Sequence, residues 1–120
     1  MPEVPKDLGG KNQHFEPVTP HELKELVTYA HGSIVSRIII KKKTGNMTLF
    51  SFDAGQELSE HTSPFDAFVY ALDGKVRLTI GGKTVTCAAG QIVHMPANVP
   101  HAVFADEKFK MLLIMIRNAG

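Results

Sequence analysis

Two histidines stand in similar settings, each in a stretch that begins at a glycine and leads into a strand-like run. His61 comes six residues after Gly55, and His101 follows a turn bracketed by Pro96 and Pro100. A neutral imidazole can ligate a metal ion or act as a general base near neutral pH. The two side chains would form one site if separate strands brought them together inside a small β-barrel, so the surrounding elements decide what chemistry is available.

Composition excludes several classes of function. The chain has 120 residues, which fits one domain, and its formal net charge of +1 lacks the basic excess of a nucleic-acid-binding protein. No apolar run approaches the roughly 20 residues of a membrane span. The start of the sequence shows no signal-peptide pattern, and the single cysteine, Cys87, allows no internal disulfide. We therefore expect a cytoplasmic protein with no nucleic-acid or membrane partner.

The first 32 residues predict an arm and a helix. Residues 1–18 are rich in Pro, Gly, Asn and Gln and predict an extended arm. Residues 19–32 predict a short helix, because Thr19 suits the N-cap, Glu22 completes a capping box and Gly32 suits the C-terminal stop. Within this range an apolar stripe has helical spacing and comprises Leu23, Leu26, Val27 and Ala30.

From residue 33 to 120 the pattern is that of an all-β domain. Short β-rich runs separated by turn signals predict an antiparallel sandwich or barrel, with strands near 34–40, 47–52, 67–72, 76–80, 83–87, 92–95, 101–104 and 108–116. The run 67–72 is apolar on both faces, so a second sheet should cover one face and the helix or a partner subunit the other. A homodimer is therefore expected.

The stretch from Gly55 to Gly74 resembles the first motif of the cupin superfamily, G-x5-H-x-H-x3,4-E-x6-G. Gly55 and His61 match, and Gly74 closes the motif. Ser63 stands where the family has its second histidine, and Ala67 stands where it has its glutamate. Two of the ligand positions of this motif are thus replaced.

The second cupin motif, G-x5-P-x-G-x2-H-x3-N, also has a counterpart. Gly90, Pro96 and His101 match, while Asn98 replaces the inner glycine and Ala105 replaces the final asparagine. With the strands around it, the resemblance covers roughly residues 34–116 and implies a double-stranded β-helix, or jelly-roll barrel, with the predicted short helix packed outside.

The resemblance also implies a metal, since members with the full motif hold a divalent ion with three histidines and a glutamate. This chain keeps His61 and His101, which implies at most a weakly held divalent ion such as Zn, Ni, Mn or Fe. A third ligand would have to come from Asp66, which a bulge near Pro64 could turn inward, or from His94, whose position in the family usually faces away from the lumen.

Several functions remain open at this point. The two histidines could bind each other, a water or Ser63 as satisfied core groups, or they could bind a small ligand without metal. We expect a small-molecule-binding barrel, in which Phe104 is a candidate for an apolar wall. The alternative is a small metal-assisted or histidine-based enzyme, a lyase or isomerase rather than a dioxygenase, acting on a small sugar or organic acid.

Overall fold

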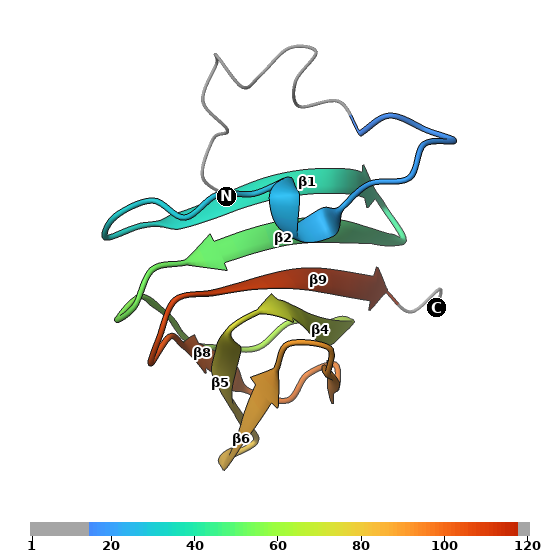
Figure 1. The fold of residues 1–120 in the computed structure, drawn as a ribbon. Coiled ribbons are helices and arrows are strands. Elements are labelled where there is room, and N and C mark those ends of the chain that lie inside the picture. The colour runs from blue at the N-terminus through green and yellow to red at the C-terminus, as the bar shows by residue number, and fades with distance from the viewer. Residues whose placement is uncertain (1–14, 118–120) are drawn as a thin grey trace.

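The computed structural model describes residues 15–117 and confirms an all-β barrel (Figure 1). Most of the predicted arm, residues 1–14, lies outside the described residues. The strands, in chain order, are β1 (Ile34–Lys42), β2 (Gly45–Phe52), β3 (Glu57–His61), β4 (Phe65–Asp73), β5 (Lys75–Ile80), β6 (Lys83–Ala88), β7 (Ile92–Met95), β8 (His101–Phe104) and β9 (Phe109–Arg117).

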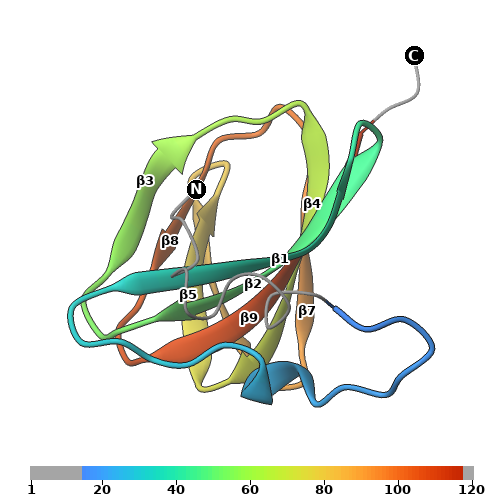
Figure 2. The ribbon, with the colours of Figure 1, turned by 90° about the horizontal axis from the view of Figure 1, so that it is seen from above.

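Two antiparallel sheets form the barrel. The larger has the strand order β1-β2-β9-β4-β7 and the smaller the order β3-β8-β5-β6. In Figure 2, β3 and β8 lie on one side of the barrel, and β4 and β7 lie on the other. The space between the sheets is filled by a buried apolar cluster that draws on both of them, including Phe52, Val69, Val76, Leu78, Cys87, Val103 and Phe109.

The predicted turns and faces are confirmed where the pattern was strongest. Gly81 and Gly82 join β5 to β6 with φ values of 55° and 84°, as a two-residue hairpin with two positive φ angles requires. Gly74, which closes the first motif, has a φ of 68°, and a Cβ there would collide with the carbonyl oxygen of Lys108. Along β5, Val76 and Leu78 are fully buried, as their alternation predicts.

The predicted helix over 19–32 is wrong. In this range, all of which the structure describes, the helical part is the single 3₁₀ turn η2 (Leu23–Glu25). Thr19 does not cap a helix, because its hydroxyl donates to the Pro17 carbonyl at 3.0 Å. Val18 beside it adopts a positive φ of 57°, which an L-residue rarely takes.

Side chains of the large sheet explain why this segment does not form a longer helix. They donate to its alternate main-chain carbonyls: Lys110 Nζ to Lys24 at 2.6 Å, Arg37 Nη1 to Leu26 at 3.2 Å, and Ser51 Oγ to Thr28 at 2.7 Å. In a helix, such carbonyls accept from amides four residues on. The sheet therefore satisfies carbonyl groups that a helix would otherwise pair with its own amides.

The apolar stripe is nevertheless used for packing. Val27 is 3% exposed and packs with Leu49 and Leu112 on the outer face of the large sheet. Leu23 and Leu26 pack against the same cluster. The segment thus covers part of this face, as the sequence predicted for a helix, but with a different backbone.

Another part of the outer face carries an exposed strip of apolar side chains, which the Asp66–His94 ion pair interrupts. Ile92 and Ile116 are 57% and 52% exposed, and Phe68 and Ile114 lie half-buried between them on adjacent strands. No helix among residues 15–117 is long and apolar enough to cross a membrane. The expected homodimer and cytoplasmic location stay predictions.

Candidate functional site

The structure brings the two motif histidines together. His61 ends β3, His101 begins β8, and the two residues are register partners in the small sheet. Their ring centroids are 4.3 Å apart with an interplanar angle of 65°. His61 is exposed, whereas His101 is only 7% exposed. The pair therefore runs from the surface into the barrel.

Hydrogen bonds define which ring nitrogen of each histidine is available. His61 Nδ1 lies 2.8 Å from the Ser59 carbonyl oxygen, and His101 Nδ1 lies 3.3 Å from that of Val99. Because a carbonyl oxygen can only accept, both Nδ1 atoms carry the hydrogen, and both neutral rings leave Nε2 as an acceptor. Among the described residues, no hydrogen bond reaches either Nε2 or joins the two rings.

Burial lowers the pKa of His101, the inner histidine. Removal of water lowers the pKa of His101 below its ordinary value, and the nearby His61 lowers it further, although the bond to the Val99 carbonyl opposes both effects. The net lowering favours the neutral imidazole at pH 7. His101 thus presents a lone pair rather than a positive charge.

A small pocket lies beside the two imidazoles. Its volume is about 70 Å³, which gives room for about two or three heavy atoms. Apart from the histidines its lining is apolar and is drawn from both sheets: Leu58, Ala67, Met95, Val103, Met111, Leu113 and Met115. The two imidazoles are therefore the polar features of an otherwise apolar cavity.

The two replaced motif positions contribute in different ways. Ala67, at the position of the family's glutamate, is 2% exposed and lines the pocket. Ser63 does not line it. The Ser63 hydroxyl accepts from the Phe65 amide at 3.1 Å, and its carbonyl accepts from the Asn98 amide at 2.8 Å. Ser63 thus connects the two motifs instead of contacting the histidines.

Asn98 explains how the second motif tolerates the loss of its glycine. Its φ is 65°, in the left-handed region. Asparagine is among the non-glycine residues that enter this region most readily. The backbone course that the motif requires is therefore kept, and with it the turn that leads to His101.

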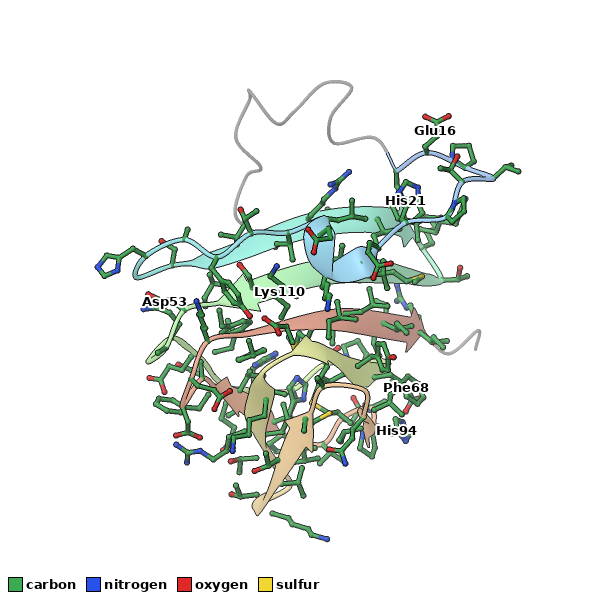
Figure 3. The ribbon with its side chains drawn as sticks, viewed as in Figure 1. Glu16, His21, Asp53, Phe68, His94 and Lys110 are labelled. Carbon is green, nitrogen blue, oxygen red and sulfur yellow. The ribbon has the colours of Figure 1, made fainter. Side chains whose placement is uncertain are left out.

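The two candidates for a third ligand lie on the outside of the large sheet. His94 Nε2 is 2.9 Å from Asp66 Oδ1, and the Ala97 amide donates to the same oxygen at 3.2 Å. The His94 ring stacks on Phe68 with centroids 4.6 Å apart, and the two lie side by side in Figure 3. The bulge considered near Pro64 does not turn Asp66 inward, and neither candidate reaches the pocket.

Phe104 also points away from the pocket. It alternates with the inward-facing Val103, and the Arg77 guanidinium lies over its ring at 4.6 Å from the centroid. Arg77 in turn donates two hydrogen bonds to Asp106, at 2.9 and 3.0 Å. Phe104 belongs to this exposed cluster on the small sheet.

The family's divalent metal does not fit these residues. Among residues 15–117 there is no group of three or more His, Cys, Asp and Glu side chains that could hold a metal ion. Two imidazoles remain, the carboxylate position is an alanine, and the serine that replaces a histidine is bonded elsewhere. The arrangement thus lacks both the ligand number and the negative charge of the family's site.

Most of the residues that form the pocket are absent from the sequence-based candidates. Methionine usually fills space in a core, yet Met95, Met111 and Met115 all line the cavity. Their signal was available in part, because 111, 113 and 115 alternate along one strand. What was missing was the register that places 95 and 115 beside Ala67.

Comparison with known proteins supports the resemblance to cupins. A family model described as a cupin domain matches residues 48–117. A conserved protein of unknown function from Streptococcus pyogenes is 36% identical, with a TM-score of 0.85 over 89% of this chain and 94% of that one. A cupin 2 conserved barrel domain protein from Leptotrichia buccalis is 42% identical, with a TM-score of 0.77 over 79% of this chain and 46% of that one.

A curated relative is more distant. An uncharacterised protein of Streptomyces coelicolor is 27% identical over 62 residues, which are 52% of this chain and 59% of the relative. The matched part thus spans little more than half of that relative's length. The family model covers more than half of this chain, and both motifs lie within it: the chain belongs to the cupin family.

Proposed function

We propose that the protein binds a small molecule in the barrel pocket and that His61 and His101 are its polar contacts. The observation that carries the proposal is the pair of Nε2 acceptors beside an apolar cavity of about 70 Å³. Neither Nε2 has a hydrogen-bond partner among the described residues, so an occupant with a hydroxyl, amide or carboxylic acid hydrogen can donate to one of them. A short apolar group of the same ligand would fill the cavity.

A divalent ion is a weaker occupant of the same place. Two imidazoles supply fewer protein ligands than the three that a catalytic zinc site usually has, and the apolar lining offers no carboxylate to offset the charge. We therefore expect Zn, Ni, Mn or Fe to bind weakly if at all.

Catalysis is the second candidate, and one observation favours it. The lowered pKa of His101 keeps its imidazole in the basic, unprotonated form at pH 7, facing the pocket. Such a group can take a proton from a bound substrate, as a lyase or isomerase requires. A short organic acid would present a suitable proton, whereas a cavity of about 70 Å³ is too small to enclose a sugar.

Ligand-induced stabilisation tests the binding proposal. A panel of short-chain alcohols, amides and acids is screened by thermal unfolding against the wild-type protein, His61→Ala and His101→Gln. A ligand at a hundred times its dissociation constant adds about 2.7 kcal/mol to the stability of the protein it binds.

His31→Ala is the matched control, because that side chain is fully exposed and outside the pocket. The wild type and the control should respond to at least one compound, and the two pocket variants should not. Equal responses from all four proteins would refute binding at this pair.

A further inference from the structure

A second hollow lies on the outer face of the small sheet, on the opposite side of that sheet from the lumen. Its volume is about 470 Å³, and its lining comes from the neighbouring strands β3, β8 and β5 (Figure 2). Small-molecule sites usually have about 300–1,000 Å³. This hollow, which we call the outer groove, is therefore large enough for a ring-shaped ligand that the lumen pocket of about 70 Å³ excludes.

A β-bulge opens the outer groove. In the pairing of β3 with β8, two residues of β3, Ser59 and Glu60, stand opposite the single residue Ala102. Such a bulge bends its strand and changes the direction of its side chains. Ala102 is small and leaves the floor of the groove open, while Thr79, its register partner on β5, lines the far side. The groove is thus built into the strand pairing of the sheet.

One end of the outer groove holds a guanidinium group in a fixed position. The Arg77 guanidinium lies over the Phe104 ring, 4.6 Å from its centroid, and donates to Asp106 from Nε and Nη2 at 2.9 and 3.0 Å. These two bonds leave Arg77 Nη1 to donate to an oxygen in the groove. Because Asp106 balances the charge of Arg77, this end of the groove attracts oxygen atoms without favouring an anion.

Two carboxylates give the rest of the groove a negative charge. Glu57 is the register partner of Phe104, and Glu60 lies in the bulge. Within residues 15–117, neither carboxylate makes a hydrogen bond or an ion pair, because Arg77, beyond Phe104 in register, bonds to Asp106 instead. No lysine of the described chain lines the groove. A ligand therefore meets two carboxylates that have no cation of their own.

We propose that the outer groove binds an amino sugar, a ring that carries several hydroxyls and one ammonium group. The ammonium group pairs with the carboxylate of Glu57 or Glu60, in a charge-assisted hydrogen bond about twice as strong as a neutral one. The ring hydroxyls donate to the second carboxylate and accept from Arg77 Nη1. A sugar with a carboxylate or phosphate is disfavoured, because the groove already has an excess of negative charge. The site is separate from the lumen pocket and independent of what binds there.

The competing explanation is a solvated polar surface that binds nothing. Charged side chains on such a surface usually gain from an opposite charge on the neighbouring strand. Glu57 and Glu60 have no such partner among the described residues, and a solvated surface requires neither the bulge nor the hollow above Ala102. Ligand binding accounts for both features.

Titration followed by amide NMR of the isotope-labelled full chain distinguishes the two explanations. The probes are glucosamine, N-acetylglucosamine and glucuronic acid, which share a sugar ring and carry a positive, a neutral and a negative group at pH 7. Glucosamine should cause saturable shifts centred on the amides of β3, β8 and β5. N-acetylglucosamine should bind at least threefold more weakly, because it lacks the ammonium group, and glucuronic acid more weakly still.

Three variants test the residues of the groove, and a fourth is the matched control. Glu57→Gln and Glu60→Gln remove one charge each and should each weaken glucosamine at least threefold. Ala102→Leu fills the floor without a change of charge and should abolish the binding of all three sugars. Glu25→Gln removes the same charge from an exposed side chain on the 3₁₀ turn η2, outside the groove, and should bind like the wild type. Thermal unfolding checks that each variant is folded.

Several results would overturn the amino-sugar site. Glucosamine that gives no saturable shift, or that binds no more tightly than glucuronic acid, would refute it. Folded Glu57→Gln and Glu60→Gln variants that both keep the wild-type affinity would also refute it. Shifts centred on the lumen-lining Met95 and Met115 instead of the groove would place the ligand elsewhere and reject the outer groove as its site.

Discussion

Ala67→Glu would restore the carboxylate of the first cupin motif, and the structure predicts what that change does. Ala67 is 2% exposed and lines the pocket shared by His61 and His101. The new side chain would therefore enter an apolar cavity of about 70 Å³ between Met95 and Met115. In the metal-free protein, no lysine or arginine among the described residues lines the pocket to pair with the new carboxylate.

Two effects set the magnitude. A buried polar group without a full set of partners costs about 1–3 kcal/mol. The glutamate side chain also exceeds a cavity that has room for about two or three heavy atoms, and such overpacking adds about 1–3 kcal/mol. We expect the free energy of unfolding to fall by about 4 kcal/mol, which is roughly 15 °C in the melting temperature of a domain of this size. Zn²⁺ at a hundred times its dissociation constant should restore about 2.7 kcal/mol, because three ligands then surround it.

Thermal unfolding with and without Zn²⁺ measures both effects, and Ala71→Glu is the control. Ala71 is fully buried on the same face of β4 but does not line the pocket. Its glutamate variant should lose stability and gain nothing from Zn²⁺. Our reasoning about position 67 fails if Ala67→Glu is as stable as the wild type, or if both variants respond to Zn²⁺ equally.

Three further predictions concern the rest of the molecule. Val27→Ala should lower the free energy of unfolding in urea by about 2 kcal/mol. The fully exposed Val18 should tolerate alanine with a change below about 0.5 kcal/mol. Equal effects would contradict the packing of the segment. The paired imidazole, and then a backbone amide, lower the pKa of Asp66, so its contribution is present above about pH 4 and lost as the pH falls through the folded-state pKa. Asp66→Asn should therefore reduce the loss of unfolding free energy between about pH 5 and pH 2, as measured by urea unfolding. An unchanged pH dependence would refute this. We also expect the exposed strip around Ile92 and Ile116 to pair two copies, so Ile116→Lys should shift sedimentation toward monomer; a wild type that sediments as a monomer at every concentration would contradict it.

Much of the barrel could be predicted because its signals are local. The hairpin at Gly81 and Gly82 needs two positive φ angles, and glycine is the residue that supplies them without strain. The alternation of Val76 and Leu78 identified the buried face of β5 without knowledge of the partner strand. Such features depend on a few adjacent residues, so the sequence pattern is enough to predict them.

Two elements could not be predicted because their structure depends on distant partners. The segment from 19 to 32 has helical spacing and an apparent capping box, yet donors from β1, β2 and β9 bind its carbonyls. Strand β3 (Glu57–His61) has no alternating apolar pattern and was not among the expected strands. It forms because β8 offers it a pairing edge. Both outcomes depend on tertiary contacts that override local propensity.

The candidate site likewise has one part that the sequence predicts and one part that depends on distant contacts. The sequence predicted that separate strands could bring His61 and His101 together, and in the structure their ring centroids lie 4.3 Å apart. The character of the pocket, however, depends on the register that sets Met95 and Met115 on either side of Ala67. A shift of one residue in either pairing would have turned one of the two sulfurs away, and no local signal specifies that register.

The position of β3 at the edge of its sheet has a consequence for how the pocket is entered. β3 has one neighbouring strand, its pairing is irregular between Leu58 and His61, and most of its residues are exposed. Short, exposed edge segments are the ones that open locally while the rest of a domain stays folded. Each such opening carries His61 away from His101, which remains anchored on β8. An occupant that bridges both imidazoles must therefore close this strand, and its measured affinity is reduced by the fraction of time that β3 is open. The amides of β3 should thus exchange with deuterium faster than those of β8, and a bridging ligand should slow them.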